Sequence, residues 1–130
     1  MRKREQPRLG DLEMRIMNVL WERGASTVRE VLGALNLKPR PAYTSVLTML
    51  RVMQEKGFVG RDESDRAHRY SAAVPEHRVK RGLLRDLVDT AFRGSPEALL
   101  VRLLEEEKLS PEELTRVQEL IARKAEEGKR

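Results

Sequence analysis

The sequence has 130 residues, 26 Lys and Arg against 21 Asp and Glu, 39% hydrophobic residues and no cysteine. A chain of this length suits one compact domain or two small interlocked ones, and the missing cysteines exclude a disulfide framework, a thiolate zinc site and a thiol nucleophile. Residues 1–80 carry a net charge of +6, from 16 Lys and Arg against 10 Asp and Glu, whereas residues 81–130 carry −1, from 10 against 11.

Three helices are predicted within the first 56 residues. Apolar residues recur at helical spacing over 11–23 and define the first. Thr27 and Glu30 have the S/T-x-x-E form of a capping box, which starts a second, short helix. After a proline-containing break, a third helix is expected over 41–56, with Pro41 in its first turn, where a missing N–H group leaves no partner unsatisfied.

The third predicted helix has two unlike sides. An apolar stripe is expected to face the core and consists of Val46, Met49, Leu50 and Met53. The opposite side offers Tyr43, Thr44, Leu47, Thr48 and Arg51, with Ser45 at its edge. Hydroxyl groups can contact phosphates or base edges, and an arginine can reach phosphate or guanine. An ordinary solvent-exposed face is the alternative, but Glu, Lys and Gln would be expected there. We therefore predict a DNA-recognition helix with contacts from Tyr43, Thr44, Ser45, Thr48 and Arg51.

After residue 57 the hydrophobic period changes from 3.6 to 2. Two short strands are expected over 58–62 and 67–71, joined by a polar turn. Arg66 at the tip of this hairpin is the best candidate for a further DNA contact, to phosphate. Arg61 and Arg69 are as well suited to surface pairing with carboxylates of the hairpin, an interaction worth little. A hairpin directly after a recognition helix predicts a winged helix-turn-helix.

Three more helices are predicted from Pro75 onward. The last two begin after Ser95 and Ser110, each a capping serine followed by a proline at the first helical position. The helix after Ser95 is apolar on almost every side, so more than one of its faces must be covered. We expect a second copy of the chain to cover it. The predicted dimerisation residues are Leu83, Leu87, Leu99, Leu100, Leu103, Leu104, Val117 and Ile121.

The predicted fold class is mainly α with a small β-hairpin wing: a winged helix-turn-helix followed by a three-helix dimerisation region. The domains are expected to be a flexible basic arm over 1–8, a winged-helix DNA-binding domain over 9–74, a helical dimerisation domain over 75–123 and a frayed charged tail over 124–130. No apolar run has the length of a signal peptide or a membrane span, which predicts a cytoplasmic protein.

Catalysis has little support in the sequence. His68 and His77 lack the spacing of metal ligands, no phosphate-binding glycine motif occurs, and the run Glu105–Glu107 reads as a solvated helix end. We therefore predict no enzyme activity, no cofactor and no metal. The basic excess of residues 1–80 favours a polyanion as the partner, although a solvated basic surface would give the same count.

Three segments occur in a characteristic order along the chain. They are Leu9-Gly10-Asp11-Leu12-Glu13 through Val19-Leu20-Trp21, then Ala42-Tyr43-Thr44-Ser45-Val46-Leu47-Thr48-Met49-Leu50 leading to Glu55-Lys56-Gly57, and Asp65-Arg66-Ala67-His68-Arg69-Tyr70. Together they resemble the BlaI/MecI penicillinase-repressor family, over about residues 9–121. The resemblance implies a homodimeric winged-helix repressor on an inverted-repeat operator, with interlocked C-terminal helices. The family's recognition-helix contacts would correspond to Thr44, Ser45, Thr48 and Arg51.

The resemblance also implies a membrane sensor-peptidase as a signalling partner and control of β-lactam-resistance or cell-wall-stress genes. In well-known members that signal leads to cutting at an Asn-Phe bond, and the corresponding bond here is Arg102-Leu103. The missing cysteines exclude the metal-binding cluster of the copper-responsive repressors. The leading hypothesis is a homodimeric transcriptional repressor that binds double-stranded DNA at a specific sequence. The alternatives are a non-specific nucleic-acid-binding protein and a helical protein-interaction module.

Overall fold

The computed structural model describes residues 9–129, so the predicted basic arm at 1–8 and the last residue of the predicted tail lie outside the described residues. The chain divides into two compact units, which meet between Gly82 and Leu83. This boundary falls inside a continuous helix, whereas the sequence analysis placed it between residues 74 and 75. None of the helices in residues 9–129 is long and apolar enough to cross a membrane.

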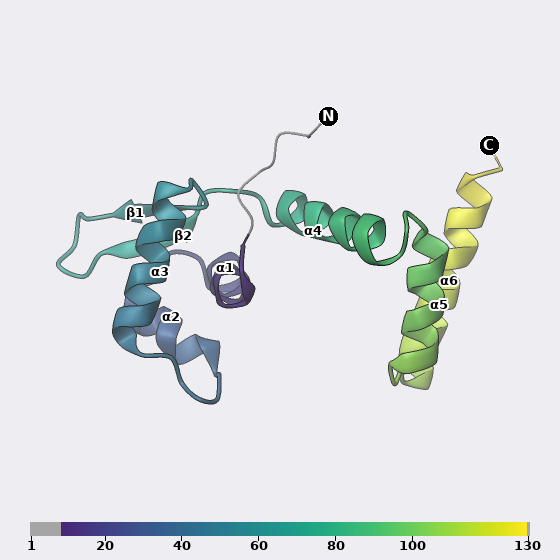
Figure 1. The fold of residues 1–130 in the computed structure, drawn as a ribbon, viewed down its shortest axis with the longest axis horizontal. Helices are drawn as coiled ribbons and strands as arrows, with labels where there is room; N and C mark the ends of the chain where they lie inside the picture. The colour runs from purple at the N-terminus through teal and green to yellow at the C-terminus, as the bar shows by residue number, and fades with distance from the viewer. Residues whose placement is uncertain (1–8, 130) are drawn as a thin grey trace. The chain divides into compact units, whose positions relative to one another are not determined.

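The first unit contains three helices and a two-stranded antiparallel sheet (Figure 1). The elements are α1 (Asp11–Arg23), α2 (Val28–Leu35), α3 (Tyr43–Glu55), β1 (Val59–Asp62) and β2 (Arg69–Ala72). Their order is that of a winged helix-turn-helix, in which the hairpin is the wing. The sequence prediction of this architecture is confirmed.

A single hydrophobic core joins the three helices to the hairpin. Three members of the predicted stripe on α3, Val46, Leu50 and Met53, are completely buried in it. Met49, the fourth, is only half-buried and packs at the edge. Tyr70 closes the core from β2 and is 1% exposed. The buried stripe turns the opposite side of α3 outward.

Helix α3 begins two residues later than predicted. The first hydrogen bonds of the helix run from the N–H groups of Ser45 and Val46 to the carbonyl oxygen of Ala42, at 3.0 and 3.2 Å. Ala42 is therefore the N-cap residue, with an extended backbone (ψ 150°). Pro41 lies outside the first turn, and its predicted place inside the helix is wrong.

The wing is anchored through β2 to the segment that precedes α2. Ser26 and Tyr70 exchange backbone hydrogen bonds of 2.9 and 2.8 Å, so this segment adds a single bridge to β2. In the hairpin Val59 lies opposite Ala72 and Asp62 opposite Arg69. Strand β2 begins two residues later than predicted, so the hairpin turn is longer than the sequence suggested.

Glu30 ties the start of α2 to its neighbours. Its carboxylate accepts a hydrogen bond from the N–H group of Thr27 at 2.9 Å, and the Thr27 hydroxyl accepts one from the N–H group of Glu30 at 3.2 Å, which confirms the capping box. Arg69 and Arg23 lie 3.2 and 3.9 Å from the same carboxylate. The backbone hydrogen bond from Thr27 and the two arginines hold the pKa of Glu30 below its ordinary value of 4.5.

Replacing Glu30 with glutamine is expected to weaken the dependence of stability on pH. Because the pKa of Glu30 is lowered by folding, its charge stabilises the protein above the unfolded pKa, and this contribution is lost as the pH falls through the folded pKa. Glutamine keeps the capping acceptor but does not titrate. Urea unfolding at about pH 7 and about pH 3 measures the effect. The variant should be less stable than the wild type at the higher pH and should approach it at the lower one; a pH-independent difference would contradict this account.

The second unit begins within α4 (Glu76–Ala91) and continues through α5 (Pro96–Glu106) and α6 (Pro111–Glu127). The predicted caps are confirmed: the hydroxyl of Ser95 accepts a hydrogen bond from Ala98 N–H at 3.0 Å, and that of Ser110 accepts one from Glu113 N–H at 3.0 Å. Helix α6 continues to Glu127, whereas the sequence analysis placed a frayed tail over 124–130.

Candidate nucleic-acid interface

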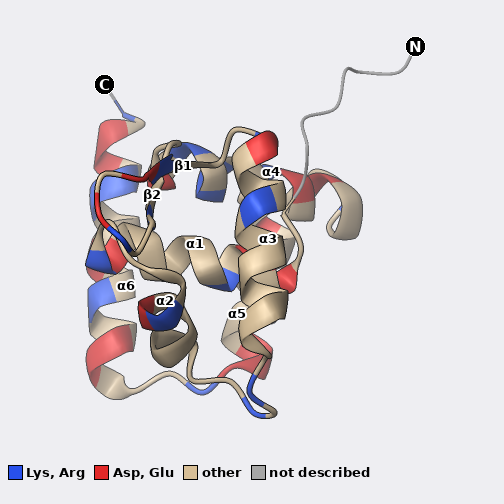
Figure 2. Ribbon diagram, turned by 90° about the vertical axis from the view of Figure 1, so that its left-hand side faces the viewer, with Lys and Arg blue, Asp and Glu red and all other residues tan. Residues whose placement is uncertain are grey.

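The outward side of α3 is polar and accessible. Tyr43, Thr44, Ser45, Thr48 and Arg51 are all exposed, as the sequence analysis expected of residues that contact DNA. The helix carries only one basic and one acidic residue, Arg51 and Glu55, so its ribbon is mostly tan in Figure 2. A side with hydroxyl groups and few charges can approach base edges without bringing carboxylates close to phosphates.

The first residue of α3 stacks against α2. The guanidinium carbon of Arg29 lies 5.3 Å from the centroid of the Tyr43 ring, within the range of a cation–π contact. Tyr43 is 41% exposed, so the pair stands at the surface. The contact joins the starts of α2 and α3 and restricts the rotation of both side chains.

The wing holds two of its arginines in ion pairs. Arg61 pairs with Glu63, and Arg69 lies 3.9 Å from Asp65 in addition to its contact with Glu30. The expected pairing of these arginines with wing carboxylates is therefore present. A hydrogen bond with the Tyr70 hydroxyl, followed in size by the one to Glu63, raises the pKa of Arg61 further above its ordinary value. Arg61 is thus held in place on β1, opposite Tyr70.

The wing turn is shaped by Asp62. Its carboxylate accepts the N–H group of Ser64 at 2.9 Å, and this hydrogen bond is the main cause of the lowered pKa of Asp62. An aspartate that bonds the backbone two residues later is a common device for reversing a chain. The carboxylate is therefore occupied by the turn, and Arg66 follows within the same turn.

A groove of about 340 Å³ lies where α2, α3 and the wing meet. Its lining residues are Thr27, Val28, Arg29, Tyr43, Leu47, Arg51, Arg61, Arg66, Ala67, His68 and Tyr70. The groove brings together three of the predicted DNA-binding residues, Tyr43, Arg51 and Arg66. The other three, Thr44, Ser45 and Thr48, are exposed on α3 but do not line it.

Sequence reasoning missed Arg29 at this interface. Arg29 is the second residue of a short helix and belongs to no motif, so nothing in the local pattern distinguishes it from other surface arginines. Its place depends on the packing of α2 against α3. Among residues 9–129, no group of three histidines, cysteines, aspartates or glutamates could hold a metal ion.

A second candidate surface lies on the helices of the second unit and is apolar. Six predicted dimerisation residues, Leu83, Leu87, Leu100, Leu103, Leu104 and Ile121, are exposed, whereas Leu99 and Val117 are half-buried. Four apolar residues of the same kind that the sequence analysis did not single out are also exposed: Leu84, Val101, Leu114 and Leu120. We call these twelve residues the apolar surface.

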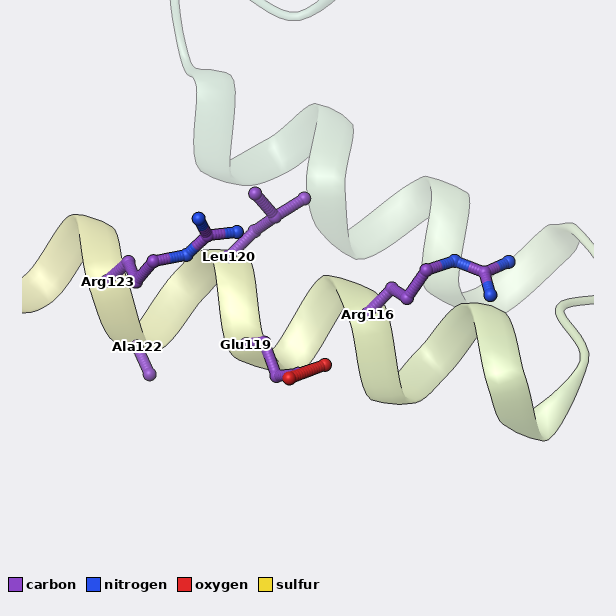
Figure 3. Close-up of a pocket in the computed structure, with 5 residues that line it drawn as sticks. All are labelled: Arg116, Glu119, Leu120, Ala122 and Arg123. Carbon is purple, nitrogen blue, oxygen red and sulfur yellow. The ribbon is translucent and has the colours of Figure 1, made fainter.

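The interior of the second unit is very small. Among residues 83–129 only Val88 is buried, and neither α5 nor α6 contributes a buried residue. On α6 a hollow of about 540 Å³ is lined by Arg116, Glu119, Leu120, Ala122 and Arg123. Figure 3 shows Leu120 with the two arginines on one side of the helix, and Glu119 and Ala122 turned away from it. Leu120 is 56% exposed and is not part of a buried core.

A family model described as penicillinase repressor matches residues 9–123. The transcriptional regulator BlaI of Mycobacterium tuberculosis (strain ATCC 25618 / H37Rv) is 40% identical over 100 residues, which cover 75% of this chain and 72% of that protein. The methicillin resistance regulatory protein MecI of Staphylococcus aureus (strain N315) is 18% identical over 116 residues, covering 89% and 94%. Among solved structures, a MarR family protein from Bacillus stearothermophilus has a TM-score of 0.50 at 16% identity, over 94% of this chain and 76% of that one, a likeness of fold.

Proposed function

Because the chain belongs to the penicillinase-repressor family, we propose that it represses transcription by binding an operator in double-stranded DNA as a homodimer. The family match extends from the first residue of the winged helix to α6 and so includes both units. A repressor acts by binding and needs no catalytic group. The hydroxyl groups and arginines of the interface are of the kinds that bind DNA. Its place of action would be the cytoplasm, where a bacterial chromosome is found.

The observation that carries the proposal is the exposed side of α3. Its hydroxyl groups and Arg51 stand away from the core, on a helix whose buried stripe is anchored by Leu50 and Met53. A helix held in this way can enter the major groove while the wing lies along the backbone. In this arrangement Thr44, Ser45 and Thr48 would contact base edges or phosphates, and Arg66 would contact a phosphate.

The second unit supports the proposed dimer. A segment of fewer than 50 residues with one buried side chain removes too little apolar area from water to be stable alone. An apolar surface spread over three helices is the usual mark of an interface. A second copy of the chain would cover it by two-fold symmetry, and two recognition helices would then meet a palindrome whose half-sites are about one or two helical turns apart.

The names of similar proteins support a proposal for the genes that this chain regulates. The names methicillin resistance regulatory protein and penicillinase repressor connect similar proteins with resistance to β-lactams, so we propose that this chain controls genes of β-lactam resistance or cell-wall stress. A membrane sensor-peptidase would be the signalling partner. The bond that corresponds to the family's cleavage site, Arg102–Leu103, lies on α5 between two exposed residues. Because Arg-Leu replaces Asn-Phe, a peptidase acting here would need a different sequence preference.

Replacing Thr48 with alanine is expected to weaken binding to the operator by about 1–3 kcal/mol, while binding to unrelated DNA stays the same. The side chain is exposed, so its removal should leave the fold intact. Fluorescence anisotropy with a labelled duplex from upstream of the protein's own gene, and with a scrambled duplex, measures both affinities. The matched control is Thr115→Ala, which removes an exposed threonine from α6.

The same titrations test the proposed function itself. A repressor should prefer the upstream duplex to the scrambled one, whereas a non-specific binder would bind both with one affinity that falls with salt. A helical protein-interaction module would bind neither. Either of these results for the wild type would refute the proposed function.

A further inference from the structure

We propose that the groove between α2, α3 and the wing is a phosphate site, in which Arg29, Arg51 and Arg66 together hold a backbone phosphate of duplex DNA. The inference rests on the proposed function and deepens it, because it assigns a DNA contact to α2 and a ligand chemistry to the groove. From its position on α3 alone, Arg51 could contact either a base or a phosphate. The inference assigns it to a phosphate.

The charge balance of the groove favours an anion. Four arginines line it and no carboxylate does. Among the described residues, Arg61 is neutralised by Glu63, while no ion pair with a carboxylate engages Arg29, Arg51 or Arg66. Three uncompensated guanidinium groups around one concavity repel each other, and an oxyanion between them removes that repulsion.

Arg29 is held in place before any ligand arrives. Its guanidinium group stacks on Tyr43, and a stacked planar group keeps its N–H donors at the edge, free for hydrogen bonds. A long arginine side chain loses conformational entropy when it binds, and a contact that already restricts it lowers that loss. Thr27, the N-cap of α2, lines the same groove, but the Glu30 carboxylate already occupies that helix start, so the attraction for an anion comes from the arginines.

The groove also suits the shape of a DNA strand. It lies between the recognition helix and the wing, the two elements that would straddle one strand of the duplex. Leu47 and the Tyr43 ring supply apolar surface for a sugar, beside the arginines that supply charge for the phosphate. A free phosphate ion has the same oxyanion chemistry but no apolar part that could contact Leu47 and the Tyr43 ring.

The test uses the full chain and a 20-base-pair duplex of random sequence, whose binding is governed by phosphate contacts. For Arg29→Gln we expect the slope of log affinity against log salt to become shallower by about 0.9, the value of one phosphate contact in B-DNA. The control Arg15→Gln removes an exposed arginine of α1 that has no ion pair among the described residues. It should change the slope much less. Equal slopes for the two variants would overturn the inference.

A lysine at position 29 separates charge from stacking. Arg29→Lys keeps the positive charge but loses the planar group that lies over Tyr43, so we expect the salt slope of the wild type with a several-fold lower affinity. A slope as shallow as that of Arg29→Gln would contradict a point-charge contact with phosphate. Circular dichroism of each variant before and after thermal unfolding identifies any loss of fold.

A competition experiment distinguishes the two sources of phosphate. Inorganic phosphate should displace the duplex no better than sodium chloride of equal ionic strength if the groove is built for the DNA backbone. Displacement that is specific to phosphate and lost in Arg29→Gln would assign the groove to a free anion and overturn the assignment to DNA. These readouts use random DNA, so they stay informative even if the wild type shows no preference for an operator.

Discussion

Replacing Ile121 with glutamate is expected to convert the proposed dimer to monomers and to remove operator binding with it. Ile121 is 54% exposed in the single chain and belongs to the apolar surface. In a two-fold interface each substitution occurs twice, and burying an unpaired carboxylate costs at least about 2 kcal/mol per copy. A total of about 4 kcal/mol raises the dimer dissociation constant about a thousand-fold.

Sedimentation equilibrium measures this constant, and the anisotropy titration with the upstream duplex measures its effect on DNA binding. A monomer keeps one recognition helix and only its own phosphate contacts, so its affinity for random DNA should also fall, with a shallower salt slope, while the preference for a palindrome disappears. The matched control is Thr115→Glu, which adds the same charge to α6 about 120° around the helix from Ile121. If both variants dimerise as the wild type does, the apolar surface is not the interface.

Replacing Leu50 with alanine is expected to destabilise the first unit by about 2–5 kcal/mol, the range measured when a buried leucine is truncated. Leu50 is completely buried in the core, and a close-packed interior relaxes only partly around the cavity left behind. Urea unfolding followed by tryptophan fluorescence reports on this unit, because Trp21, the one tryptophan, lies on α1.

Two residues of α3 then separate stability from recognition. Thr48→Ala, on the exposed side of the same helix, should leave the urea midpoint close to that of the wild type while it weakens operator binding. Leu50→Ala should do the opposite at temperatures where it remains folded. A large stability loss in Thr48→Ala, or none in Leu50→Ala, would mean that the two sides of α3 are assigned the wrong way round.

The helices, and the beginnings of α2, α5 and α6, could be predicted from the sequence because their signals are local. Thr27 with Glu30 and Ser110 with Glu113 satisfy each other's amide groups within one turn, and no distant residue is needed for either box. The two-sided pattern of α3 also follows from spacing alone, so Val46, Leu50 and Met53 were correctly placed in the core.

Features that depend on distant residues were not predictable. The stack of Arg29 on Tyr43 joins two helices, and the hydrogen bonds between Ser26 and Tyr70 join segments more than 40 residues apart in the chain. The length of the wing turn was also underestimated, although its signal is local: the carboxylate of Asp62 accepts the N–H group of Ser64, and the second strand resumes only at Arg69. Hydrophobic periodicity predicts which face of its own helix or strand a residue occupies, but not which residues of other elements contact that face.

The single buried residue of the second unit has a consequence for gene control. If α4, α5 and α6 gain their core only from a partner, folding of this unit and pairing of two chains are one reaction, whose extent depends on protein concentration. Where monomers predominate, the number of active repressors then varies with the square of the number of chains. A modest fall in synthesis, or removal of part of the pool, would therefore lower the number of active repressors by more than the proportional loss of chains.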